Sequence, residues 1–158
     1  MKKPTDQSVI TYTGPEGLKQ VTLNSLDADH DGLRLFEIKS MEEFVPQQEA
    51  EKIRQEFVNR KIYTKELSNV SYLEPWTDVE ELVKTYWRFR YIDPKKFEIK
   101  TEILIYNDVV AMYDYREGIF CVEIHNKKLA DMQKGLFDYL WNLAETPIIG
   151  PGGRTSLM

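Results

Sequence analysis

The sequence predicts an α/β domain in which helices cover both faces of a mixed sheet. Short segments rich in β-branched and aromatic residues are typical of strands. Between them, apolar residues recur at steps of three and four, which is typical of amphipathic helices. These segments follow the order β-α-β-α-β-α-β-β-β-α. The order predicts a first half with parallel strands and a second half built from hairpins.

The first half contains three predicted strand–helix pairs. The strands cover residues 8–13, 33–38 and 61–68, and the helices cover residues 16–26, 46–59 and 77–87. Pro15 suits a helix start, and Glu16 favours the positive helix end. Thr77 and Glu80 have the spacing of a capping box. Because residues 61–68 contain two lysines, we expect that strand near an edge of the sheet.

The second half contains three predicted strands and a long helix. The strands cover residues 103–106, 109–115 and 119–124, and turns are expected at residues 107–108 and 116–118. The helix then carries one apolar stripe, formed by Leu129, Met132, Leu136, Phe137, Leu140, Trp141 and Ala144. We expect this stripe to pack on one face of the sheet.

The totals describe one globular domain. A chain of 158 residues is large enough for a single core, and we assign the domain to residues 8–146, between a flexible N-terminus (1–7) and a flexible C-terminal tail (147–158). The net charge of −5 argues against a non-specific nucleic-acid surface. Cys121 is the one cysteine, which fits a reducing cytoplasm. No apolar stretch has the length of a membrane span.

Residues 27–32, DADHDG, match the first half of a calcium-binding EF-hand loop. The second half departs from it, because Arg34 occupies an apolar position and Ile38 replaces the bidentate acid. Calcium needs about six to eight oxygen ligands. We therefore favour a solvated turn, with no metal site and no cofactor.

His125, Lys127 and Asp131 approach the phosphodiesterase signature H-x-K-x-x-x-x-D, but Asp131 comes one residue early and Met132 holds the required place. In that chemistry a histidine attacks phosphorus, so it must be held in a pocket with a cation. We favour a chance match between a strand end and a helix start.

Two long runs carry a family resemblance. The runs FEIKTEILIYNDVVAMYDY and GIFCVEIHNKKLADMQKGLFDYLW, preceded by VITYTGPEGLKQV and LRLFEI, resemble the effector domain of TrmB-type transcriptional regulators. The resemblance covers roughly residues 8–146. It implies a phospholipase-D-like fold, which in that family normally follows a winged-helix DNA-binding domain. No winged helix is visible here, so we expect a stand-alone effector domain or a part of a longer protein.

The resemblance also implies what happened to the catalytic strand. The H-x-K-x-x-x-x-D positions fall on Lys100, Glu102 and Asn107, none of which can perform the original role. We therefore expect no phosphodiesterase activity. The low-ranking alternative is a phosphodiesterase that works through His125 and Lys127.

The function implied by the resemblance is a non-catalytic, cytoplasmic effector-sensing and dimerisation domain. The family implies a homodimer, a small ligand that is often a sugar, DNA contact only through the winged helix, and no membrane. If a pocket persists at the lost catalytic centre, the candidate ligand-binding residues are Glu37, Lys100, Glu102 and Asn107. In an alternative without ligand binding, Lys100 and Glu102 form an ion pair at the surface. Another is a dimerisation or protein-interaction module with no ligand.

Overall fold

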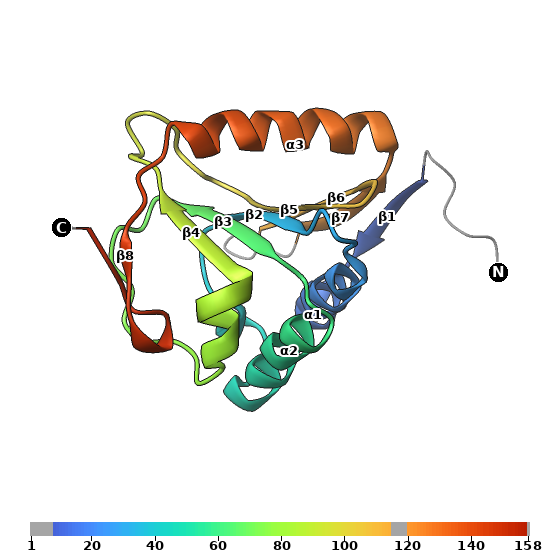
Figure 1. Ribbon diagram of the computed structural model, residues 1–158. Coiled ribbons are helices and arrows are strands. Elements are labelled where there is room, and N and C mark those ends of the chain that lie inside the picture. Colours follow the sequence, from blue (N-terminus) through green and yellow to red (C-terminus); the bar gives the residue numbers. More distant parts are fainter. Residues whose placement is uncertain (1–7, 115–119, 158) are drawn as a thin grey trace.

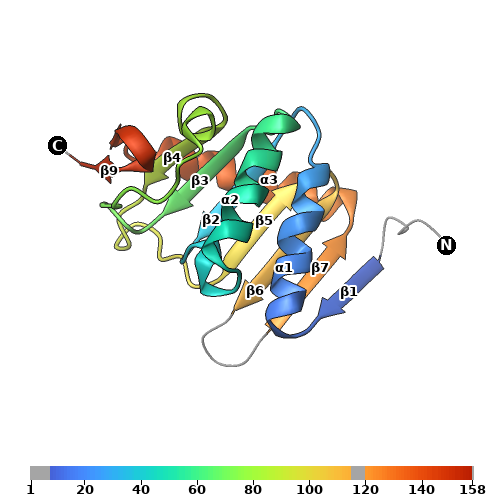
Figure 2. The same cartoon turned by 90° about the horizontal axis from the view of Figure 1, so that it is seen from below.

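One sheet lies between helices on both of its faces. The computed structural model describes residues 8–114 and 120–157. Helix α3 (Lys127–Asn142) covers one face, while α1 (Gly14–Asn24) and α2 (Gln47–Asn59) lie side by side on the other (Figures 1 and 2). The predicted mixed sheet with helices on both faces is therefore confirmed.

The sheet has seven strands in the order β1-β7-β6-β5-β2-β3-β4. The strands are β1 (Ser8–Tyr12), β2 (Leu33–Glu37), β3 (Thr64–Ser68), β4 (Trp87–Tyr91), β5 (Glu102–Tyr106), β6 (Val109–Asp114) and β7 (Phe120–His125). Strands β2, β3 and β4 pair in parallel, and β5, β6 and β7 pair antiparallel. The predicted division into a parallel half and a hairpin half is confirmed, except that β1 pairs antiparallel with β7.

The predicted helix at residues 77–87 is shorter than expected. It reduces to a short π-helical turn, Leu82–Tyr86, followed directly by β4. Trp87 and Phe89 point into the core while Arg88 is exposed, so the aromatic and arginine residues alternate as in a strand. Strand β3 lies next to the edge strand β4, so the expected position of residues 61–68 near an edge of the sheet is confirmed.

The capping box expected at Thr77 does not form. The Thr77 hydroxyl accepts the N–H of Val79, but the Glu80 carboxylate accepts the N–H of Gly152 from the far end of the chain. Glu80 thus links the π-helical turn to the C-terminal segment.

The C-terminal tail is packed, contrary to the flexible tail expected at residues 147–158. Strands β8 (Ile148–Ile149) and β9 (Thr155–Ser156) form a small hairpin. The Trp76 indole N–H donates to the Gly153 carbonyl at 3.0 Å, and Leu73 exchanges backbone hydrogen bonds with Thr155. Gly153 has φ +83°, and a Cβ there would lie 2.2 Å from the Trp76 indole nitrogen, so only glycine fits. The segment 1–7 and the turn at 116–118 lie outside the described residues.

Helix α3 faces the sheet with only part of its predicted stripe. Phe137 and Trp141 are buried against Phe36, Leu67 and Ile105. Met132 and Leu136 are exposed instead. The apolar residues of this helix thus form two stripes on different sides, although their spacing in the sequence predicted a single stripe.

Candidate ligand-binding site

A cavity of about 310 Å³ lies on the α1/α2 face of the sheet. Its floor comes from β2, β3 and β4, one wall from α2, and its rim from the connection that contains Leu73 and Trp76. Most of its lining is apolar or aromatic, including Phe57, Trp76, Trp87 and Phe89. Since the C-terminal hairpin holds Leu73 and Trp76, the packed tail supports the rim of this cavity.

The polar floor of the cavity is a pair of carboxyl groups, Glu37 on β2 and Glu66 on β3. The two strands are parallel neighbours, and their register puts both side chains on the cavity face. Burial raises the pKa of Glu37 well above its ordinary value, and its hydrogen bond with Glu66 raises it further. Burial also raises the pKa of Glu66, whose carboxylate accepts the Trp87 indole N–H at 3.2 Å. Of the two carboxyl groups, Glu37 is therefore the one whose protonated form is favoured more strongly, and its proton can be donated to Glu66.

A buried arginine forms the wall above this pair. Arg54 of α2 binds the Glu42 carboxylate at 2.5 Å and the Glu51 carboxylate at 2.6 Å. Its guanidinium also lies 4.8 Å from the centre of the Trp76 ring. The charge of Arg54 lowers the pKa of both Glu37 and Glu66, but burial outweighs it, so both pKa values stay above the ordinary value.

This protonated pair should make stability fall as pH rises. The pKa of Glu37 is higher in the native state than in the unfolded chain, where it is about 4.5. As pH rises from about 4.5 towards the native-state pKa, the native protein therefore keeps protons that the unfolded chain has lost, and the free energy of unfolding falls. Glu37→Gln keeps a donor to Glu66 without a titrating proton. We expect it to be more stable than the wild type at pH 8 by on the order of 1 kcal/mol or more, with little gain at pH 4.

Urea unfolding between pH 4 and pH 9 measures this effect. Glu98→Gln is the matched control, because Glu98 is exposed and lies 3.7 Å from Lys100. Equal pH profiles for the wild type and Glu37→Gln would contradict a shared proton at the cavity floor.

Two of the four predicted site residues meet at this cavity. Glu37 lines it. Glu102 is buried beside it, and its Oε1 accepts the backbone N–H groups of Ile38 at 2.5 Å and Lys39 at 2.7 Å. Glu102 thus holds the chain where it leaves β2 and turns along the cavity rim. Whether these two residues bind a ligand stays a prediction.

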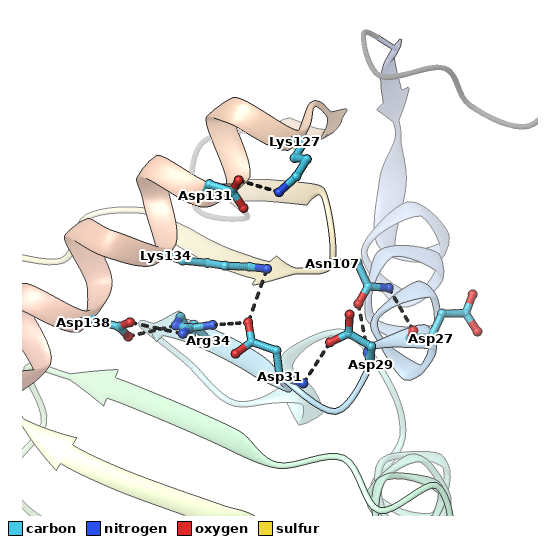
Figure 3. A network of polar contacts seen from close by, with 9 residues as sticks. All are labelled: Asp27, Asp29, Asp31, Arg34, Asn107, Lys127, Asp131, Lys134 and Asp138. Carbon is cyan, nitrogen blue, oxygen red and sulfur yellow. Dashed lines mark hydrogen bonds and ion pairs between the residues drawn. The ribbon is translucent and has the colours of Figure 1, made fainter.

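The other two predicted residues lie elsewhere. Lys100 is exposed and forms an ion pair with Glu98 at 3.7 Å, whereas Glu102 is buried, so the alternative of a Lys100–Glu102 surface ion pair is wrong as well. Asn107 lies in the turn at the opposite end of β5, with φ +49°. Its side chain accepts the Asp29 N–H at 2.9 Å and donates to the Asp27 carbonyl at 3.0 Å (Figure 3).

The acidic loop at residues 27–32 is a turn between a helix and a strand, as the sequence favoured, and it is also tied to α3, which the sequence did not predict. The Asp29 carboxylate accepts the Asp31 N–H, and Asp31 forms ion pairs with Arg34 and Lys134 at 3.0 and 3.4 Å (Figure 3). Arg34 also binds Asp138 on α3 through two hydrogen bonds. In residues 8–114 and 120–157, no group of three or more His, Cys, Asp or Glu side chains could hold a metal ion.

His125 and Lys127 are engaged separately. The His125 Nε2 lies 2.6 Å from the buried Glu123 carboxylate, at the end of β7. Lys127 binds Asp131 at 2.7 Å along the exposed side of α3 (Figure 3). The expected lack of phosphodiesterase activity stays a prediction.

Sequence reasoning missed Arg54, Glu66, Trp76 and Trp87. One signal was present in β3, where Thr64, Glu66 and Ser68 alternate as three polar residues on one face of a strand. A buried strand with such a face indicates a polar cavity or a polar network. Arg54 gave no comparable signal, because an arginine in a charged helix is usually solvated.

Comparison with known proteins identifies the fold. No protein-family model matches the sequence, and comparison with curated proteins finds no significant match. Solved structures resemble the chain, and three of them have a TM-score of 0.60 each. TrmBL2, an archaeal chromatin protein with a novel mode of DNA binding, is 16% identical, and the match covers 92% of this chain and 55% of TrmBL2.

The other two structures are Nuc from Salmonella typhimurium, a phospholipase D family member, and NucT from Helicobacter pylori. They are 16% and 12% identical, and each match covers 89% of this chain and 97% or 99% of the other. The chain has a phospholipase-D-like fold. It spans about half the length of TrmBL2 and nearly the whole of Nuc and NucT. None of the described helices is both long enough and apolar enough to cross a membrane.

Proposed function

We propose that this chain is a non-catalytic effector-sensing domain of a transcription regulator, and that its ligand binds in the cavity above Glu37 and Glu66. The observation that carries the proposal is the cavity itself, whose volume of about 310 Å³ suits a small molecule. A DNA-associated context is supported by the shared fold of TrmBL2, a chromatin protein. At 16% identity that likeness shows fold alone, so the role rests on the cavity.

The lining of the cavity fits a sugar or a similar polyol. The Glu37–Glu66 pair can accept and donate hydrogen bonds to hydroxyl groups, while the rings of Trp76 and Trp87 can pack on the apolar face of a sugar ring. A phosphate would fit poorly, because the floor carries a carboxylate and Glu102 adds a second acidic group nearby.

Ligand binding can be coupled to a partner through the cavity rim. Trp76 belongs to the rim and also binds the C-terminal hairpin through Gly153. A ligand that prefers one position of Trp76 would shift the equilibrium between two states of that hairpin. DNA would be contacted by another domain or chain, and the domain would act as a homodimer.

Thermal melting with a panel of mono- and disaccharides tests the proposal. A ligand at about 100 times its Kd should stabilise the native state by about 2.7 kcal/mol. We expect a saturable rise in Tm for the wild type and for Glu98→Gln, which alters an exposed residue away from the cavity. Thr64→Met should abolish the rise, because Thr64 lines the cavity and the longer side chain would fill it.

Two results would contradict the proposal. One is a panel, extended to amino acids and nucleosides, in which no compound stabilises the wild type. That outcome would favour an interaction module without a ligand. The other is hydrolysis of a generic phosphodiester that is lost in His125→Ala, which would favour the phosphodiesterase alternative.

A further inference from the structure

Helix α3 carries a second apolar stripe that faces away from the sheet. Three side chains of α3 and Leu143, which caps its C-terminal end, form this outer seam; their exposed fractions are 58% for Met132, 50% for Leu136, 67% for Tyr139 and 46% for Leu143. Their spacing of four, three and four residues is the a/d spacing of a heptad. Phe137 and Trp141 face the sheet from the other side of the helix. The fold of one chain therefore gains little from the outer seam.

A glycine in the middle of α3 also lacks a role within the chain. Gly135 is exposed, and a Cβ built on it meets no atom within 4 Å among the described residues. A glycine in a helix interior costs about 1 kcal/mol relative to alanine. Gly135 lies between Met132 and Tyr139 in the sequence, directly beside Leu136, so its missing side chain would let a second helix approach closely.

We propose that the outer seam of α3 is a self-association surface, on which the α3 helix of a second copy packs antiparallel. The proposal names the surface of the homodimer in the proposed function, but it does not depend on ligand binding. A twofold axis through the middle of the outer seam, between Leu136 and Tyr139, would place the same four side chains on both sides of the interface.

Charge favours a second copy in the antiparallel direction. Lys127 and Lys128 lie at the N-terminal end of α3, and the C-terminal end carries the negative end of the helix dipole and is followed by the exposed Glu145. Antiparallel packing brings these opposite charges together. Parallel packing would place the lysines of both copies side by side.

The size of the outer seam sets the expected affinity. One 16-residue helix offers less than the roughly 800 Å² per partner of a standard interface. We therefore expect a dissociation constant of about 1–100 μM. Sedimentation velocity over a range from about 5 to 500 μM should show the dimer fraction rising with concentration.

Leu136→Glu is the first variant. It should weaken the dimer at least tenfold, because a carboxylate would be buried at the centre of the interface. Val70→Glu is the matched control, since Val70 is also an exposed apolar residue, 41% exposed, but lies outside α3. Both should keep the circular dichroism spectrum of the wild type.

Gly135→Leu separates self-association from a structural role. It should raise the Tm of the dilute monomer, since leucine favours a helix more than glycine does, and yet weaken the dimer by keeping the helices apart. A purely structural Gly135 would lower the Tm on substitution.

The proposal is overturned if the wild type stays monomeric over the whole range, or if Leu136→Glu and Val70→Glu change the dimer equally. A monomeric wild type that still binds a sugar would overturn this proposal and leave the ligand site standing. An outer seam that binds only a different protein, or lipid vesicles, while the chain itself stays monomeric, would also overturn it.

Discussion

Trp141→Ala should destabilise the protein by about 3–5 kcal/mol, the usual cost of removing a large buried aromatic side chain. Trp141 is buried between α3 and the sheet, where it stacks on Phe137 with ring centres 5.8 Å apart. The Arg90 guanidinium lies 4.6 Å from the centre of its ring and donates to its backbone carbonyl. The side chain thus joins α3 to the edge strand β4 as well as filling the core.

Urea unfolding of the dilute protein measures this loss. Tyr139→Ala is the control on the same helix, because Tyr139 is largely exposed, and its cost should stay within about 0.5 kcal/mol. If Trp141→Ala cost as little as Tyr139→Ala, α3 would not be packed on the sheet as described.

Arg54→Met should destabilise the protein by about 3–5 kcal/mol, because it removes a buried cation and leaves two partly buried acids without their partner. The Arg54 side chain is almost fully buried and binds both Glu42 and Glu51. Burial alone would raise the pKa of Glu42, but its hydrogen bond from Arg54 lowers that pKa below its ordinary value. Stability from this contact is therefore present above the unfolded pKa and is lost as pH falls.

The pH dependence of the Arg54–Glu42 contact gives a second test of this prediction. The cost of Arg54→Met should shrink at low pH, where Glu42 is protonated in both proteins. Arg60→Met is the control, since Arg60 follows α2 directly and its ion pairs with Glu56 and Asp27 are exposed, so its loss should cost less than about 1 kcal/mol. Equal costs at pH 3 and pH 7 would contradict the buried ion pairs.

The architecture could be predicted because the periodicity of single segments and the order of the segments along the chain point to the same fold. Strands 33–38 and 103–106 and the helix ending in Trp141 have clear periodicity, and their order leaves few topologies. The segment at residues 77–91 was predicted only in part. Leu82, Val83 and Tyr86 have a helical spacing and form the π-helical turn, but Trp87 continues that spacing and instead begins β4, because residues 87–91 pair with β3. The tail failed because its glycines pack against Trp76, a contact between distant segments that composition does not reveal.

The candidate site could be predicted only where it coincides with strand ends. Glu37 ends β2 and Glu102 begins β5, and antiparallel pairing of these two strands brings both residues to one end of the sheet. Lys100 and Asn107 came from matching a motif, and the motif's spacing does not guarantee one location. Arg54 and Glu66 lie 12 residues apart on different elements, so only the packing of α2 over β3 unites them.

The outer seam of α3 shows a further limit of periodicity. Leu136 and Phe137 are neighbours in the sequence, yet one is half exposed and the other fully buried. When a helix has apolar residues on two sides, its sequence predicts that both sides pack against something. The sequence does not say which of the two sides packs on the chain's own sheet.

Intrinsic fluorescence tests the ligand site most directly, because two of the three tryptophans line the cavity. Trp141→Phe leaves Trp76 and Trp87 as the only indoles. Titration with a sugar that raises the Tm should give a saturable change in their emission, and Thr64→Met should remove it. A stabilising sugar that leaves this emission unchanged, or acts equally on Thr64→Met, would show that the cavity above Glu37 and Glu66 is not the ligand site.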